Sequence, residues 1–220
     1  MKKYIAAVIC CLTALGASAQ TNRVAPEIVV RRIPGTNDPA RDRNTWSLDQ
    51  ALTIYEKVKG RALLRHPQLK GGRMPFAIGE SPEKTGSAIE AHLFQQGITT
   101  MPLGENLMLI VPVALTNDLP LPPLPSDSSV TNRQKSSLGT LDFQNAPLPQ
   151  VFAVFGELNQ KLVVNASEMS SLPVRITFRS NIPLQRSEVV YALETLLLWN
   201  GIKIVPIDGK TCKAVAISAK

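Results

Sequence analysis

The strongest constraint on the fold is that one pattern of residues occurs twice in this 220-residue chain. The run from Tyr55 to Arg65 is matched by the run from Phe155 to Asn165, and the run from Ala88 to Pro102 by that from Ala192 to Pro206. Apolar positions, one glycine and one proline coincide within these pairs. The pattern therefore predicts two copies of one small domain, and little polar chemistry is shared between the copies.

The spacing of the two copies shows where they differ in length. Tyr55 and Phe155 are 100 residues apart, whereas Gly97 and Gly201 are 104 residues apart. We place the four-residue difference between Ile78 and Ala88.

The second unit, residues 141–220, alternates between strand and helix patterns. Period-two alternation is typical of a half-buried strand, and apolar residues three or four apart are typical of a helix with one buried face. In chain order we expect a strand at 141–143, a turn at Asn145 and Pro147, a helix carrying Val151, Phe152, Phe155 and Leu158, strands at 161–164 and 174–178, a helix with Ser187 as its N-cap and Glu188 in its first turn, and strands at 202–206 and 212–217.

The first unit, residues 45–115, has the same order with weaker signals. We expect a helix at 46–58, a strand at 62–64, an alternating strand at 74–78, a helix at 85–96, and strands at 98–103 and 107–111. The predicted fold class is α+β, with two repeated strand-helix-strand-strand-helix-strand-strand domains. Gly97 and Gly201 are expected as left-handed residues that end the second helix of each unit.

The remaining segments are predicted to be a leader, a lead-in and a linker. Residues 1–19 have the three parts of a secretory signal peptide: Lys2 and Lys3, an apolar stretch, and small residues before Gln20. A lipoprotein signal is the alternative, but Cys10 and Cys11 lie inside the apolar stretch. Residues 20–44 form a flexible N-terminal segment with one apolar patch at 28–30. Residues 116–140 form a Pro/Ser-rich linker, expected to act as an extended spacer.

These segments predict an exported, periplasmic protein, with outer-membrane association as the alternative. No other segment reaches the roughly 20 apolar residues that span a bilayer, so no stable membrane insertion is expected. After the leader is removed, Cys212 is unpaired and each unit depends on its apolar core. The formal charge is +7. A basic surface suits nucleic acid, anionic lipid or acidic glycan, but a solvated surface is the interpretation we favour.

The second unit resembles the first N-terminal periplasmic domain of bacterial secretins of type II secretion and type IV pili. The same short domain occurs at the N-terminus of some TonB-dependent receptors. The resemblance is carried by Phe143, Phe155 and Leu158, by the run 162–164, by Val174-Arg-Ile-Thr-Phe178, by Glu188, by 193–202, and by the hairpin from Ile204 to Val215. It implies two divergent secretin-like domains without the pore domain, able to dock with protein-transport machinery of the cell envelope.

Catalytic and metal-binding chemistry finds no support in the sequence. A hydrolytic triad needs a nucleophile, a histidine and a carboxylate, and His66 and His92 are interpreted as satisfied surface residues. Cys212 is expected to be a buried, inert thiol. Zinc needs three or four nitrogen or sulfur ligands, which the two units do not assemble. We therefore expect no enzyme activity, no cofactor and no metal.

Partner binding remains as the predicted function. The chain lacks the aromatic and G-x-x-G features of RNA-binding domains, so no nucleic acid is expected. Small sheets have free strand edges to which an extended peptide can pair. The possible partner-contact face is Arg175, Thr177 and Arg179, which alternate along one strand. The alternatives are a self-associating structural envelope protein, such as a ring component, or a basic nucleic-acid- or glycan-binding protein.

Overall fold

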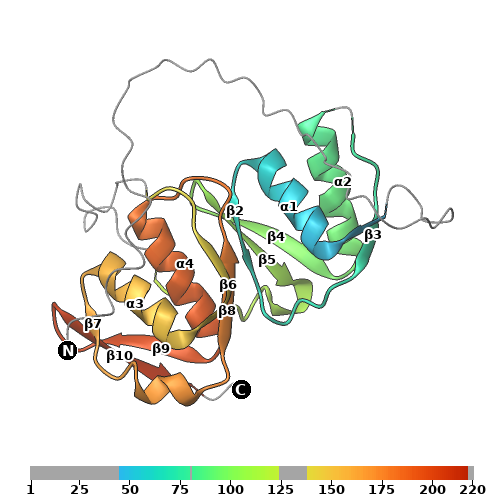
Figure 1. The fold of residues 1–220 in the computed structure, drawn as a ribbon. Coiled ribbons are helices and arrows are strands. Elements are labelled where there is room, and N and C mark those ends of the chain that lie inside the picture. The colour runs from blue at the N-terminus through green and yellow to red at the C-terminus, as the bar shows by residue number, and fades with distance from the viewer. Residues whose placement is uncertain (1–44, 80, 124–137, 218–220) are drawn as a thin grey trace, which may run out of the picture. The chain divides into compact units, whose positions relative to one another are not determined.

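The computed structural model describes residues 45–79, 81–123 and 138–217, which form a mixed α+β fold as predicted (Figure 1). The predicted signal peptide (1–19) and N-terminal segment (20–44) lie outside the described residues. Below, residues 45–115 are called the first half and residues 141–217 the second half. The elements of the first half are β1 (Thr45–Ser47), α1 (Leu48–Lys59), β2 (Ala62–Arg65), β3 (Arg73–Pro75), α2 (Pro82–Gln95), β4 (Ile98–Leu103), β5 (Leu107–Pro112) and the short 3-10 helix η1 (Val113–Leu115).

The second half has the same order of strands and α-helices. Its elements are β6 (Asp142–Pro147), α3 (Leu148–Asn159), β7 (Leu162–Val163), the 3-10 helix η3 (Glu168–Ser171), β8 (Arg175–Arg179), α4 (Arg186–Trp199), β9 (Ile202–Pro206) and β10 (Thr211–Ala216).

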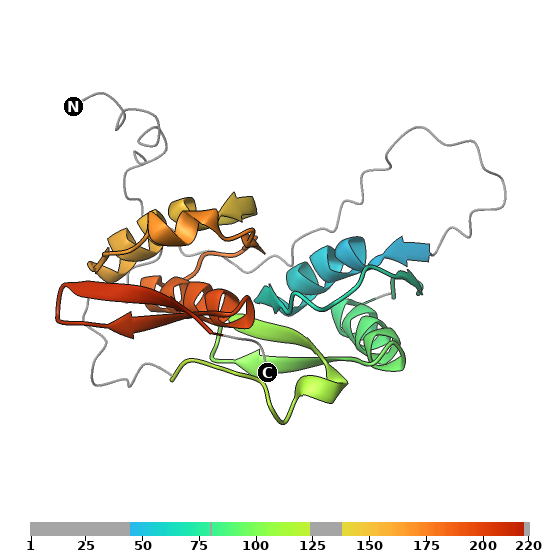
Figure 2. The same cartoon turned by 90° about the horizontal axis from the view of Figure 1, so that it is seen from below.

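Strand pairing is also the same in the two halves. In the first, β1 pairs antiparallel with β3, and β5 lies between β2 (parallel) and β4 (antiparallel). In the second, β6 pairs antiparallel with β8, and β10 lies between β7 (parallel) and β9 (antiparallel). Figures 1 and 2 show the two helices of each half beside its three-stranded sheet.

The helices of the first half begin at different residues from those predicted. Trp46 pairs with Met74 in β1, so α1 begins two residues later, where Ser47 and Gln50 form a reciprocal capping box. The second helix begins at Pro82, because the Ser81 hydroxyl accepts the Lys84 N–H and proline suits the first turn.

Two predictions about helix starts in the second half are wrong. Ser187 is not the N-cap of α4, because the helix begins at Arg186 and Gln185 occupies the cap position. Glu188 lies in the first turn as expected, and its carboxylate accepts the Gln185 N–H at 2.8 Å. Asn145 does not turn the chain into α3. It lies within β6 at a bulge, with φ 54°, and donates its N–H to Thr177.

The length difference between the halves is divided between two places. Met74 lies opposite Trp46 in the first half, and Ile176 lies opposite Ala146 in the second. Since Trp46 and Ala146 are 100 residues apart, Met74 corresponds to Ile176, an offset of 102. Two of the four extra residues therefore precede β8, in the loop that contains η3. The prediction that all four lie after Ile78 is wrong.

Two apolar cores hold these elements together, and one of them contains side chains from both halves. The first-half core joins α1 and α2 to one face of the sheet β2-β5-β4, through residues such as Met108 and Ile110. The other face of that sheet, including Leu64 and Leu109, belongs to the same continuous cluster as the buried residues of α3 and α4. As a result, β5 is buried on both faces.

The predicted spacer differs from an isolated tether over the part that the structure describes. Pro120 accepts a hydrogen bond from the Trp199 indole N–H at 3.0 Å, and Pro122 accepts one from the Tyr191 hydroxyl at 3.2 Å. Leu119 packs on the shared core. The start of the linker therefore lies along α4. Within residues 45–79, 81–123 and 138–217, no helix has the length and apolarity needed to cross a bilayer.

Candidate functional site

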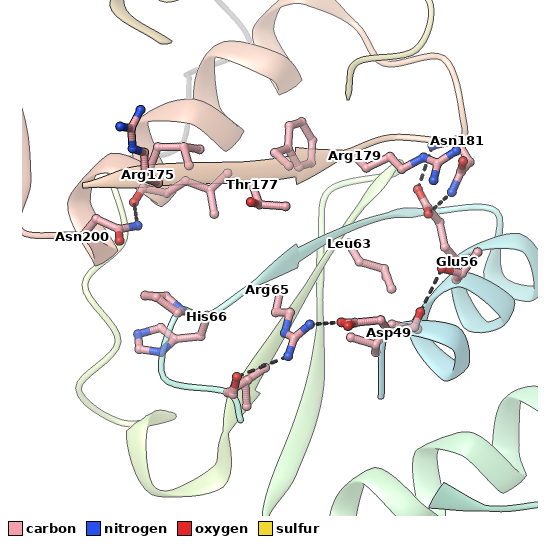
Figure 3. Close-up of a pocket in the computed structure, with 17 residues that line it drawn as sticks. Asp49, Glu56, Leu63, Arg65, His66, Arg175, Thr177, Arg179, Asn181 and Asn200 are labelled. Carbon is pink, nitrogen blue, oxygen red and sulfur yellow. Dashed lines mark hydrogen bonds and ion pairs between the residues drawn. The ribbon is translucent and has the colours of Figure 1, made fainter. Parts of the chain in front are cut away.

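A pocket of about 550 Å³ lies where α1 and β2 of the first half meet β8 of the second half (Figure 3). Its wall on the first-half side includes Asp49, Glu56, Arg65 and His66. On the other side it is lined by the whole of β8, Asn181 and the end of α4. The pocket therefore requires both halves of the chain.

The three residues predicted as a partner-contact face all line this pocket. Arg175, Thr177 and Arg179 are exposed, while Ile176 and Phe178 between them are buried in the core. This alternation is that of a strand with one buried face. Figure 3 shows the three side chains along β8. The structure thus places them together on one side of the strand.

Two carboxylates of α1 reach into the pocket and have partners there. Asp49 accepts an ion-paired hydrogen bond from Arg65, whose other guanidinium nitrogen donates to the Leu69 carbonyl at 3.2 Å. Glu56 accepts the backbone N–H of Asn181 at 2.9 Å and also its side-chain amide. Burial raises the pKa of Glu56, and the two bonds from Asn181 oppose that shift.

The β8 arginines are less well neutralised than Arg65. Arg179 lies 3.9 Å from Asp142 at an exposed position, a separation at which an ion pair contributes little. For Arg175, no carboxylate within the described ranges lies at ion-pair distance. Three guanidinium groups and two carboxylates line the pocket, and Asp142 beside Arg179 is a third carboxylate nearby. The charge of Arg179 also opposes the rise in the pKa of Glu56 that burial causes. Arg175 is therefore the pocket arginine without an ion pair among the described residues.

The prediction that both histidines are surface residues is wrong for His66. The residue is only 5% exposed, and its ring packs on the Trp199 ring at a centroid distance of 5.0 Å and accepts the Gln68 N–H through Nδ1. Burial lowers the pKa of His66, which favours the neutral form of the ring. His92 lies on α2, half-buried beside Phe76, and the structure does not bring the two histidines together.

The two hydroxyl groups that line the pocket are both hydrogen-bonded to the backbone. That of Thr177 accepts the Asn145 N–H, and that of Thr53 donates to the Asp49 carbonyl. Neither is hydrogen-bonded to a histidine, the arrangement that activates a nucleophile. Cys212 is buried as predicted, away from this pocket, and burial raises its pKa. In the part of the chain that the structure describes, no group of three metal-ligating side chains is found.

Asp49, Glu56, Arg65 and Asn181 were not predicted as site residues. They come from both halves, and only the packing of one half on the other brings them together. One signal was present in the sequence. At the 100-residue offset, Glu56 corresponds to Gly156, so the first half has a carboxylate where the second half has none.

No protein-family model matches the chain, and no curated protein matches it either.

Replacing His66 with phenylalanine is expected to make stability less dependent on pH. The ordinary pKa of a histidine is about 6.5, and burial lowers the pKa of His66 in the folded protein. Below about pH 6.5 the unfolded chain therefore binds more protons than the folded protein does. The wild-type protein should therefore lose stability as the pH falls from about 7 toward 5. Phenylalanine keeps a ring against Trp199 but does not titrate.

Urea unfolding at pH 7.5 and pH 5.5 measures this effect in both proteins. The raised pKa of Glu56 acts in the opposite direction, but equally in wild type and variant, so the difference between them reports His66. An equal loss of stability in the two proteins would contradict the assignment of a neutral, buried imidazole.

Proposed function

We propose that this chain is a non-enzymatic binding module of the cell envelope, and that it binds a carboxylate-bearing segment of a partner protein in the pocket between α1, β2 and β8. One observation carries the proposal: Arg175 and Arg179 line the pocket from one strand, Arg179 has only an exposed pair with Asp142 at 3.9 Å, and Arg175 has no ion pair among the described residues. Guanidinium groups form strong, bidentate hydrogen bonds with carboxylates.

Contact through side chains fits this pocket better than strand addition. An added strand needs about 4.8 Å on each side, or about 10 Å between the strands that flank it. The Cα atoms of β2 and β8 approach within 8 Å of each other, so no strand fits between them. Pairing with a free strand edge elsewhere in the sheets stays a prediction.

The cellular setting is part of the proposal. The signal peptide expected at residues 1–19 supports export to the periplasm. The shared order and pairing of elements in the two halves is consistent with a duplicated domain of the secretin-like type. We infer that the partner is a component of secretion, pilus or other envelope machinery.

A direct test uses a fluorescein-labelled ten-residue peptide of alternating glutamate and serine, titrated into the full chain and followed by anisotropy. The double variant Arg175→Gln/Arg179→Gln is expected to bind at least ten-fold more weakly, because each lost charged hydrogen bond is worth about 1.5–3 kcal/mol. The matched control, Arg73→Gln/Lys210→Gln, removes the same charge from exposed positions outside the pocket and should leave binding unchanged.

Three outcomes would count against the proposal. The acidic peptide does not bind, or the pocket variant and the control variant lose affinity equally. In the third, a single-stranded oligonucleotide binds more tightly than the peptide at physiological salt, and the partner is then a nucleic acid.

A further inference from the structure

The outer face of the second-half sheet, β7-β10-β9, is apolar and exposed. Leu162 is 66% exposed, Val164 49%, Ile207 58%, Val215 38% and Val205 37%. Leu162 pairs with Thr211, which also lies opposite Ile207, and one step along the sheet Lys213 pairs with Val205. Directly opposed residues of neighbouring strands lie on the same face. These side chains therefore form one continuous surface, which we call the open face.

The first half has the same face, and there it is covered. At the offsets given above, Leu162 and Val164 correspond to Ala62 and Leu64, and Val215 corresponds to Val111. All three first-half residues are buried in the core that is shared with α3 and α4. One surface of the domain is thus buried in one copy and exposed in the other.

The element that covers the first-half face is the helix α4. Glu188, in its first turn, accepts two hydrogen bonds from Asn106, in the turn between β4 and β5. Trp199, at its last residue, packs on His66, just after β2. The two ends of α4 are thus fixed near the two ends of β2, because the Asn106 carbonyl accepts the Ala62 N–H and His66 directly follows β2. Apolar side chains of the shared core lie between them. An α-helix therefore fits against this face of the sheet.

Two lysines distinguish the open face from its covered counterpart. Lys213 stands where the first half has Leu109, and Lys203 where it has Thr99. Both lysines are exposed, and Lys203 lies directly opposite Val215 in the sheet. A helix that covers this face would bury apolar surface and also meet two ammonium groups. Carboxylates on that helix would neutralise them.

We propose that the open face binds an amphipathic helix of a partner protein, with an apolar stripe over Val164, Val205 and Val215 and acidic residues opposite Lys203 and Lys213. The open face is separate from the pocket between α1, β2 and β8, which we call the arginine pocket. The occupant of the open face does not depend on what that pocket binds.

A second copy of this chain is a poorer occupant. The helix of the first half that corresponds to α4 is α2. Its positions matching Tyr191, Thr195 and Trp199 are Ser87, Ala91 and Gln95. These side chains are exposed, and they bring neither large apolar groups nor carboxylates. The packing of α4 on the first half therefore cannot be repeated by α2 on the open face of another copy.

The test uses two labelled 18-residue peptides with leucines along one helical face, flanked by glutamates in one and by lysines in the other. Binding to the full chain is followed by anisotropy. We expect the glutamate peptide to bind and the lysine peptide to bind at least ten-fold more weakly. Lys213→Glu should reverse part of that preference, lowering affinity for the glutamate peptide about five-fold and raising it for the lysine peptide.

Val205→Asp should weaken binding of the glutamate peptide at least ten-fold, because it places a carboxylate in the apolar stripe. Phe94→Asp is the matched control: Phe94 is 68% exposed on α2, and its replacement should leave affinity unchanged. Circular dichroism establishes that each variant is folded.

Several results would overturn the proposal. In one, neither peptide binds. In another, Val205→Asp binds as well as the wild type. In a third, phosphatidylglycerol vesicles bind the chain through the open face and the peptides do not, so the partner is a membrane. In a fourth, the chain self-associates and Val215→Asp abolishes this, so the occupant is a second copy. If the glutamate-serine peptide fails to bind at the arginine pocket, the results expected for the two 18-residue peptides at the open face stay the same.

Discussion

Replacing Leu109 with lysine is expected to lower the free energy of unfolding by about 3–5 kcal/mol, the usual cost of an uncompensated charge in a protein interior. Leu109 is 1% exposed on β5 and belongs to the core shared by the two halves. The new ammonium group would be buried against the second half without a carboxylate to neutralise it. A loss of this size is a large part of the stability of an ordinary domain.

The corresponding position of the second half provides the control. Lys213→Leu makes the reverse exchange on the open face and should change stability by no more than about 0.5 kcal/mol, as surface substitutions usually do. Urea unfolding monitored by the fluorescence of Trp46 and Trp199 compares the two variants. If Leu109→Lys is as stable as the wild type, the second half does not cover the first-half sheet.

This contrast illustrates how far the sequence predicts the fold. The order of strands and helices follows from hydrophobic periodicity and is confirmed in both halves. The run from Leu107 to Val111 is apolar throughout, which is typical of a strand buried on both faces, whereas the matching run from Thr211 to Val215 includes Lys213. The sequence thus contains a sign that one face is covered. It does not say which element covers it, because that depends on contacts between residues far apart in the chain, such as Asn106 with Glu188.

Element boundaries were harder to predict, for local reasons. Ser187 has the right chemistry for an N-cap, but Glu188 bonds to the Gln185 N–H, and that bond fixes the start of α4 earlier. Trp46 fits a helical pattern, but its indole donates to the Phe76 carbonyl and its backbone pairs with Met74. For Trp46, these hydrogen bonds outweighed a helix propensity worth only tenths of a kcal/mol.

The candidate site was predicted only in part. Alternation along β8 was enough to place Arg175, Thr177 and Arg179 on one side of a strand. Glu56 and Asn181 are 125 positions apart, and no pattern within either copy relates them. Their contact exists because the halves pack together, so it follows from the tertiary structure and not from local sequence.

Replacing Trp199 with alanine is expected to lower the free energy of unfolding by about 3–5 kcal/mol, the usual cost of deleting a large aromatic side chain from a core. Trp199 is 9% exposed at the end of α4. Its ring packs on His66 of the first half, and its indole N–H donates to Pro120, in the segment that follows the first half. One side chain therefore joins three parts of the chain, and its deletion leaves a cavity between them.

Trp199→Phe separates the two contributions of this residue. Phenylalanine keeps most of the ring packing but cannot donate to the Pro120 carbonyl, so the expected loss is only about 1 kcal/mol for the hydrogen bond, plus the smaller ring. Urea unfolding followed by circular dichroism suits both variants, because each removes a fluorophore. Trp46→Phe is the matched control in the first half, where the lost hydrogen bond to Phe76 lies within one copy. If Trp199→Ala costs less than about 1 kcal/mol, the end of α4 does not join the halves, and the pocket beside it would lose the wall that His66 and Asn200 provide.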